Sequence, residues 1–172
     1  MVDELSDPRR IEPVFVADER AMLEAWLEYH RVTLLLKCEG LDADQLRARP
    51  VASSRLSLHG LVRHMGEVER NWFRRVLSLE RDAPYIWADR EVEDSELVPL
   101  DDADWHSDLA MWHTECDASR AAAASHGLDD VGERRGEPCS LRWIYVHMIE
   151  EYARHNGHAD IIRELVDGSV GD

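Results

Sequence analysis

The chain has 172 residues, which is enough for one domain with a sizeable core. Its 20 basic and 36 acidic residues give a formal net charge of −16, and such a field repels nucleic acid and anionic membrane surfaces. No run of eighteen apolar residues occurs, and the charged first residues lack the apolar core of a secretory signal. Three widely spaced cysteines, Cys38, Cys116 and Cys139, do not suggest a disulfide framework, so a reducing cytoplasmic location is expected.

The N-terminal half is predicted to contain an arm and two helices. Residues 1–17 include two prolines and are expected to form the arm. A helix from Asp18 to about Glu39 is indicated by residues at three- and four-residue steps, namely Met22, Trp26, Tyr29, Thr33 and Leu36, and Gly40 ends it. The connector "LDADQLRARPVASS" has room for one short helical turn. Ser57 is expected to cap a second helix that runs to about Glu80, with one face formed by Leu61, His64, Val68 and Trp72 or Phe73.

The C-terminal half is predicted to contain a long loop and two further helices. Residues 81–100 hold Pro84, Pro99 and an acidic run, and they are interpreted as an exposed loop in which short strands could occur. The third helix is expected to start near 101–104 and to stop at Gly127. After the polar crossover "LDDVGERRGEPC", a helix capped by Ser140 is expected to run to about Val166.

Four long helices without strand alternation predict an all-α fold, an antiparallel four-helix bundle with a long loop after the second helix. The expected organisation is an arm over 1–17, the bundle over 18–166 and a tail over 167–172. "SLHGLVRHMGEVER" and "SLRWIYVHMIEEYA" share Ser-Leu, five residues, His-Met, one residue and Glu. This echo suggests a two-fold pseudo-repeat in which the second and last helices face each other.

The last helix carries polar residues where a core-facing stripe is expected. The stripe consists of Ile144, Met148, Glu151, His155, His158 and Ile162. A carboxylate on such a stripe is unfavourable unless it is paired or binds a metal. Glu151 and His155 are separated by one helical turn, roughly 6 Å along the axis, so both could bind one cation. His158 could pair with His155 in the same way, whereas Glu151 and His158, about 10 Å apart along the axis, are too far apart to share a small ion.

A third ligand must come from another helix, and His64 on the inward face of the second helix is the candidate. Three protein ligands leave one coordination position open, which is typical of catalytic sites. The competing interpretation of Glu151 and His155 is a solvated helix face. His147 can pair with Glu151 but lies too far along the helix to join the whole set. His30 is expected to pack in the core, and no role is predicted for the other histidines, which are interpreted as surface or cap residues: His59, His106, His113 and His126.

The stretches "LSLHGLVRHMGEVERNWF" and "SLRWIYVHMIEEYARHNGHAD" resemble the DinB/YfiT-like superfamily of metal-binding four-helix bundles, and the similarity extends from about Asp18 to Val166. Many members carry His at both positions of the last-helix pair, where this chain has Glu151 and His155. That departure is similar to the mycothiol-dependent branch, which includes maleylpyruvate isomerase and single-domain mycothiol S-transferases. The resemblance implies a divalent metal bound by His64, Glu151 and His155, with His158 beside the site.

The resemblance further implies that the protein adds mycothiol, or a similar small thiol, to an electrophilic small molecule, with zinc as the expected ion and nickel as the alternative. Possible pocket walls are Trp26, Tyr29, His30 and Trp143, for which aromatic core packing is the competing interpretation. Two other functions stay open: a non-catalytic metal-binding or stress-response protein, and a metal-dependent hydrolase. The expected partners are small molecules and neither nucleic acid nor membrane, and a homodimer is left open.

Overall fold

The computed structural model describes residues 7–89, 95–98 and 103–171. Most of these residues are helical, which confirms the predicted class in its broad form. The elements are α1 (Glu19–Cys38), α2 (Ala43–Arg47), α3 (Leu58–Glu69), the π-helix η1 (Arg70–Leu77), the 3₁₀-helix η2 (Ser95–Leu97), α4 (Trp105–Ala124), β1 (Val131–Arg134), β2 (Glu137–Ser140) and α5 (Leu141–Asp167). Within the described part of the chain, none of the helices has both the length and the apolar character needed to cross a lipid bilayer.

The helices begin where the sequence supplies a capping side chain. Ser57 and Ser140 accept hydrogen bonds from the backbone N–H groups of Gly60 and Trp143, which confirms the predicted caps. Asp18 and Asp104 cap α1 and α4 in the same way. Each of these bonds satisfies a donor that has no partner within the helix, and this fixes where the four long helices start.

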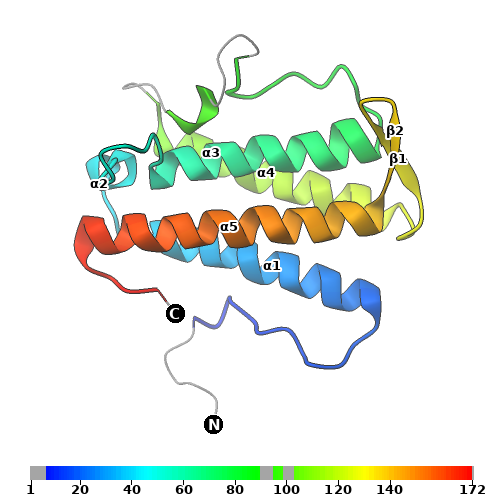
Figure 1. The fold of residues 1–172 in the computed structure, drawn as a ribbon, viewed down its shortest axis with the longest axis horizontal. Coiled ribbons are helices and arrows are strands. Elements are labelled where there is room, and N and C mark those ends of the chain that lie inside the picture. Colours follow the sequence, from blue (N-terminus) through cyan, green and yellow to red (C-terminus); the bar gives the residue numbers. More distant parts are fainter. Residues whose placement is uncertain (1–6, 90–94, 99–102, 172) are drawn as a thin grey trace.

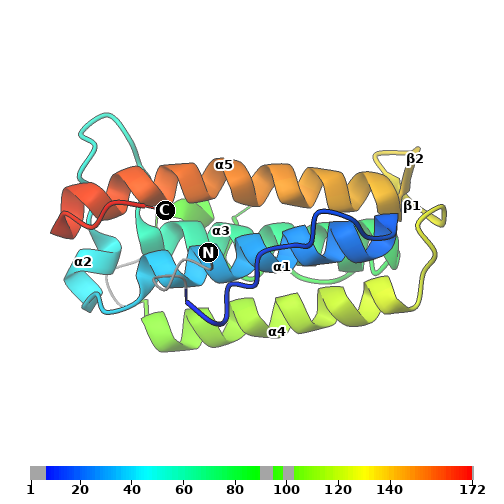
Figure 2. The same ribbon diagram turned by 90° about the horizontal axis from the view of Figure 1, so that it is seen from below.

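The four long helices lie side by side, but they do not alternate in direction along the chain (Figures 1 and 2). Helix α1 packs against α5 and runs in the same direction, while α3 packs against α4 and both run the opposite way. The predicted antiparallel order is therefore wrong for the step from α3 to α4. The reason is visible in Figure 1, where residues 81–89 lead back along α3, so that α4 can start at the same end as α3.

The buried face of α1 differs from the predicted one. The residues that it buries are Leu27, Arg31, Thr33, Leu34 and Cys38, so of the predicted stripe only Thr33 belongs to this set. Trp26 is instead 38% exposed. Apolar residues occur around most of this helix, so hydrophobicity alone did not define which face of α1 is buried. The buried face includes Arg31, whose guanidinium forms a buried ion pair with Glu69 at 2.7 Å.

Two connecting segments also differ from their predictions. The polar crossover contains an antiparallel hairpin in which β1 pairs with β2, from Val131 opposite Ser140 to Arg134 opposite Glu137. The segment 81–100 was expected to be exposed, yet Glu96 and Leu97 are buried. Its described residues contain no strand, while 90–94 and 99–102, with Pro99, lie outside the described residues.

Candidate metal centre

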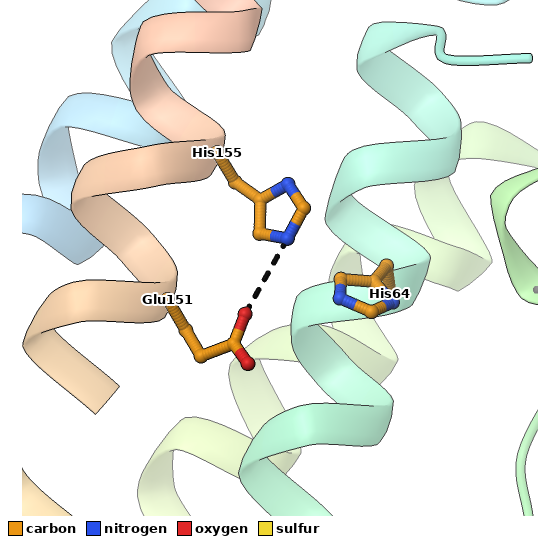
Figure 3. Close-up of side chains that lie close together, drawn as sticks. All are labelled: His64, Glu151 and His155. Atoms are coloured by element: carbon orange, nitrogen blue, oxygen red, sulfur yellow. Dashed lines mark ion pairs between the residues drawn. The ribbon is translucent and has the colours of Figure 1, made fainter. Parts of the chain in front are cut away.

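Two imidazoles and a carboxylate meet in the space between α3 and α5. Ligand atoms of His64, Glu151 and His155 all lie within 4.8 Å of one another. Figure 3 shows Glu151 and His155 projecting from successive turns of α5 toward His64 on α3. The Nε2 atom of His155 lies 3.5 Å from a carboxylate oxygen of Glu151. The structure thus brings together the three residues that sequence spacing selected.

The packing of α5 explains why its polar pair points inward. Met148, Tyr152 and Ile162 are almost completely buried, and they hold this face of the helix against the core. Glu151 and His155 lie at the edge of that face, with 14% and 10% of their side chains exposed. A helix repeats every 3.6 residues, so residues four apart share one side. The two side chains therefore have access both to the interior and to a ligand that enters from solvent.

His64 is oriented by a residue that sequence reasoning missed. Its Nδ1 atom lies 2.9 Å from a carboxylate oxygen of Glu96, which is buried on η2. This contact with His64 is also the main reason why the pKa of Glu96 is lowered, so the carboxylate is ionised at neutral pH. A carboxylate that accepts a hydrogen bond from Nδ1–H leaves the Nε2 lone pair of the ring available as a ligand.

The sequence contained an indirect signal for this contact. Helix α3 has two glycines, and a Cβ atom built at Gly60 would lie 2.0 Å from the carbonyl oxygen of Leu97. At Gly66 the corresponding atom would lie 2.9 Å from the Trp87 ring. A glycine inside a helix commonly marks the close approach of another element. The two positions therefore indicate where the 81–98 segment packs on α3, and the first of them brings Glu96 to His64.

Glu67 fixes the same segment further along α3. One of its carboxylate oxygens accepts hydrogen bonds from the backbone N–H groups of Ile86, Trp87 and Ala88, at 2.6, 2.6 and 3.0 Å. The indole N–H of Trp87 donates to Asp108 on α4 at 2.8 Å. These bonds tie the part of the segment that precedes η2 to two helices, α3 and α4.

His155 also has a partner on its other ring nitrogen. Its Nδ1 atom lies 3.4 Å from Nδ1 of His158. Burial, and then the neighbouring His155 ring, lower the pKa of His158, so this imidazole is neutral at pH 7 and can accept a hydrogen bond. Each imidazole of the cluster thus has its Nδ1 atom beside a potential acceptor, which is the usual arrangement of metal-binding histidines.

Glu151 is the charged member of the cluster. The contact with His155, followed by that with Arg154, lowers the pKa of Glu151 to about 2, although partial burial acts in the opposite direction. One oxygen of the Glu151 carboxylate faces His155, and the other lies 3.3 Å from Nε2 of His147. Glu151 is therefore an ionised ligand candidate at any physiological pH. Two imidazoles and one carboxylate suit zinc and related divalent ions.

The remaining predicted residues are distributed differently. His59 was interpreted as a surface residue, but it is fully buried, with Nε2 2.8 Å from Asp108. The α1 residues Trp26, Tyr29 and His30 form an aromatic cluster with one another. Trp143 is 46% exposed and stacks on His147, so it is not a core residue.

Comparisons with known proteins identify the family of the chain. The family model described as Mycothiol-S-transferase matches residues 22–168, which is most of the chain and includes all three members of the cluster. A search of curated proteins gave no match. The matched region begins in α1 and ends at Gly168, directly after α5. The chain therefore belongs to the mycothiol S-transferase family.

Proposed function

We propose that this protein transfers mycothiol, or a similar small thiol, to an electrophilic small molecule in a reaction that depends on a divalent metal, with zinc as the expected ion. The observation that carries the proposal is the convergence of His64, Glu151 and His155 in a chain of this family. Such an ion would stabilise the thiolate of an entering thiol at neutral pH, where a free thiol of pKa about 8.5 is mostly protonated.

The residues of the chain have separate tasks in this proposal. His64 and His155 would hold the ion through Nε2, and Glu151 would contribute a negative charge that offsets part of its positive charge. Glu96 and His158 orient the two imidazoles through Nδ1. The substrate sulfur attacks the electrophilic carbon, a carbon–sulfur bond forms as the bond to the leaving group breaks, and the thiol proton passes to solvent.

The cysteines of the chain support a sulfur that belongs to the cosubstrate. Burial raises the pKa of Cys38 to about 12 and that of Cys116 well above its usual value. Cys139 is half-buried, and burial raises its pKa too. A reactive cysteine needs the opposite shift, because the thiolate is the nucleophile. None of the three is therefore assigned a chemical role.

We further infer that the four long helices form a four-helix bundle of the DinB type over residues 18–166. The arm over 1–17 and the tail over 167–172 are additions to it. The arm is anchored by Arg9, which forms two hydrogen bonds with Glu39 at the end of α1. Within the tail, Gly168 ends α5 in a left-handed conformation with a φ of 83°.

A thiol panel tests the proposed function. Zinc-loaded protein is mixed with 1-chloro-2,4-dinitrobenzene and with mycothiol, cysteine or glutathione, and release of chloride is followed. We expect turnover with mycothiol that is lost in His155→Ala together with zinc, while the Glu164→Gln variant, with an exposed change on the same helix, keeps it.

Two other outcomes would replace the proposal. Ester turnover without any thiol would indicate the hydrolase. A protein that binds zinc tightly but has no activity with any thiol or ester would indicate a metal-binding role without catalysis.

A further inference from the structure

A second group of potential ligands adjoins the first on the outer side of α5. Ligand atoms of His147, Glu150 and Glu151 lie within 4.8 Å of one another. Glu151 belongs to both groups, and its two oxygens face different rings. One lies 3.5 Å from Nε2 of His155, and the other lies 3.3 Å from Nε2 of His147.

The imidazole of His147 is held rigidly. It stacks on Trp143 with ring centroids 5.0 Å apart and an interplanar angle of 17°. It also packs against Trp72, with ring centroids 4.4 Å apart and an interplanar angle of 61°. Its Nδ1 atom lies 3.8 Å from Glu150. Two aromatic contacts thus present this ring to the carboxylates, which a ring on a solvated helix face would not need.

A guanidinium now balances the charge of the two carboxylates. Arg154 forms ion pairs with Glu150, at 3.4 Å, and with Glu151. Its side chain is 51% exposed, so it can turn into solvent at little energetic cost. The ion pairs of Arg154 use the carboxylate oxygens that do not face His147, so its positive charge lies beside, and not at, the position where two carboxylates and an imidazole could bind a divalent ion.

We propose that His147, Glu150 and Glu151 form a second divalent-cation site, with Glu151 as a carboxylate shared by two ions. The ligand set of one imidazole and two carboxylates is compatible with zinc or manganese. Arg154 leaves the oxygens that face His147 free for the second ion, and its nearby positive charge weakens the binding of that ion. This inference deepens the proposed function, on which it rests for the first ion, because the shared carboxylate gives up charge to its second partner and makes the first ion a stronger Lewis acid.

The test counts zinc ions bound per chain. Metal-free protein is equilibrated with buffered free zinc over a wide concentration range and analysed by elemental mass spectrometry, with calorimetry for affinities. We expect one tight and one weaker equivalent in the wild type. Glu150→Gln should lose only the weaker one. Arg154→Gln should bind it about two- to tenfold more tightly, the scale expected for removing exposed ion pairs. Glu164→Gln removes an exposed charge elsewhere on α5 and should change neither affinity.

The outcomes separate this inference from the proposed function. Saturation at one equivalent in both the wild type and Arg154→Gln, lost in His155→Ala, would overturn the second site and leave the first. A single equivalent that survives in His155→Ala but is lost in Glu150→Gln would support the second site and refute the first. A weaker equivalent that persists in Glu150→Gln would be non-specific binding to an acidic protein, and it would overturn the inference.

Discussion

The helices α3 and α5 contribute to two polar clusters that differ in how their charges are satisfied. In the first, Arg31 from α1 binds both carboxylate oxygens of Glu69, at 2.8 and 2.7 Å, and neither side chain is more than 3% exposed. Tyr152 donates to the same carboxylate at 2.8 Å, and Trp112 donates to Tyr152 at 3.0 Å. Every charge in this cluster has a partner inside the protein.

The cluster of His64, Glu151 and His155 is arranged differently. Its imidazoles are held through Nδ1, while Nε2 and the carboxylate converge, and all three side chains keep some exposure to solvent. The comparison separates a structural ion pair from a ligand site. Burial of charged groups is common to both clusters, but only in the second do two imidazoles and a carboxylate converge, and the guanidinium that bonds to this carboxylate, Arg154, is 51% exposed.

The largest expected effect is on the free energy of unfolding when the buried pair of Arg31 and Glu69 is broken. Replacing Arg31 by Met leaves Glu69 buried without its cation, and this should lower the free energy of unfolding by about 3–5 kcal/mol in urea titrations. Arg81→Met, which removes an exposed pair with Glu133, should change it by less than about 1 kcal/mol. The folded Arg31→Met protein should still bind zinc. Loss of zinc without loss of stability would contradict the distinction between the two clusters.

The second prediction concerns the ligand cluster. His155→Ala should lower zinc affinity more than the roughly 10- to 100-fold that removal of an outer hydrogen-bonding partner costs. The metal-free variant should lose less stability than Arg31→Met does, because no buried charge is left unpaired. Competition with a chromophoric chelator measures the affinity. If His158→Ala removes the ion and Glu151→Ala does not, the α5 ligand pair is His155 with His158.

A smaller effect is expected from the residue that orients His64. Glu96→Ala should weaken zinc binding by about 10- to 100-fold, and Glu96→Gln by less, because an amide oxygen still accepts a hydrogen bond from Nδ1–H. Gly60→Ala, whose Cβ would meet the Leu97 carbonyl, should displace η2 and reproduce the effect of Glu96→Ala. Unchanged affinity in both alanine variants would show that Glu96 does not support the site.

The smallest effect is expected from the cysteines. A protein with Cys38, Cys116 and Cys139 all replaced by Ala should keep its zinc and its transfer rate with mycothiol, although loss of buried sulfur will lower stability. The rate should also vary less with pH near neutrality than the uncatalysed reaction does. A folded, zinc-loaded triple variant without transfer activity would place the nucleophile on the protein.

Sequence reasoning found the helices and the pair of Glu151 and His155 because both depend on local rules, whereas His64 was named from the inward face of its helix and from the family resemblance. Ser57 and Ser140 are strong caps, and the spacing of Glu151 and His155 fixes them on one side of a helix whatever it packs against. The sequence reasoning placed His59 on the surface because Asp108, the residue that pairs with His59 in the interior, lies on another helix. The hairpin was missed because its strands are short and polar, so they show no alternating pattern.

The sequence by itself determined where the helices start, which residues share a face of α5, and that a carboxylate and an imidazole point in the same direction. These properties follow from capping and from the 3.6-residue repeat, which act over a few neighbouring residues. The tertiary structure alone decided that α1 turns Arg31 inward, that α3 and α4 run parallel, and that Glu96 meets His64. Each of these depends on pairing between residues far apart in the chain, and an ion pair or hydrogen bond of that kind leaves no periodic trace in the sequence.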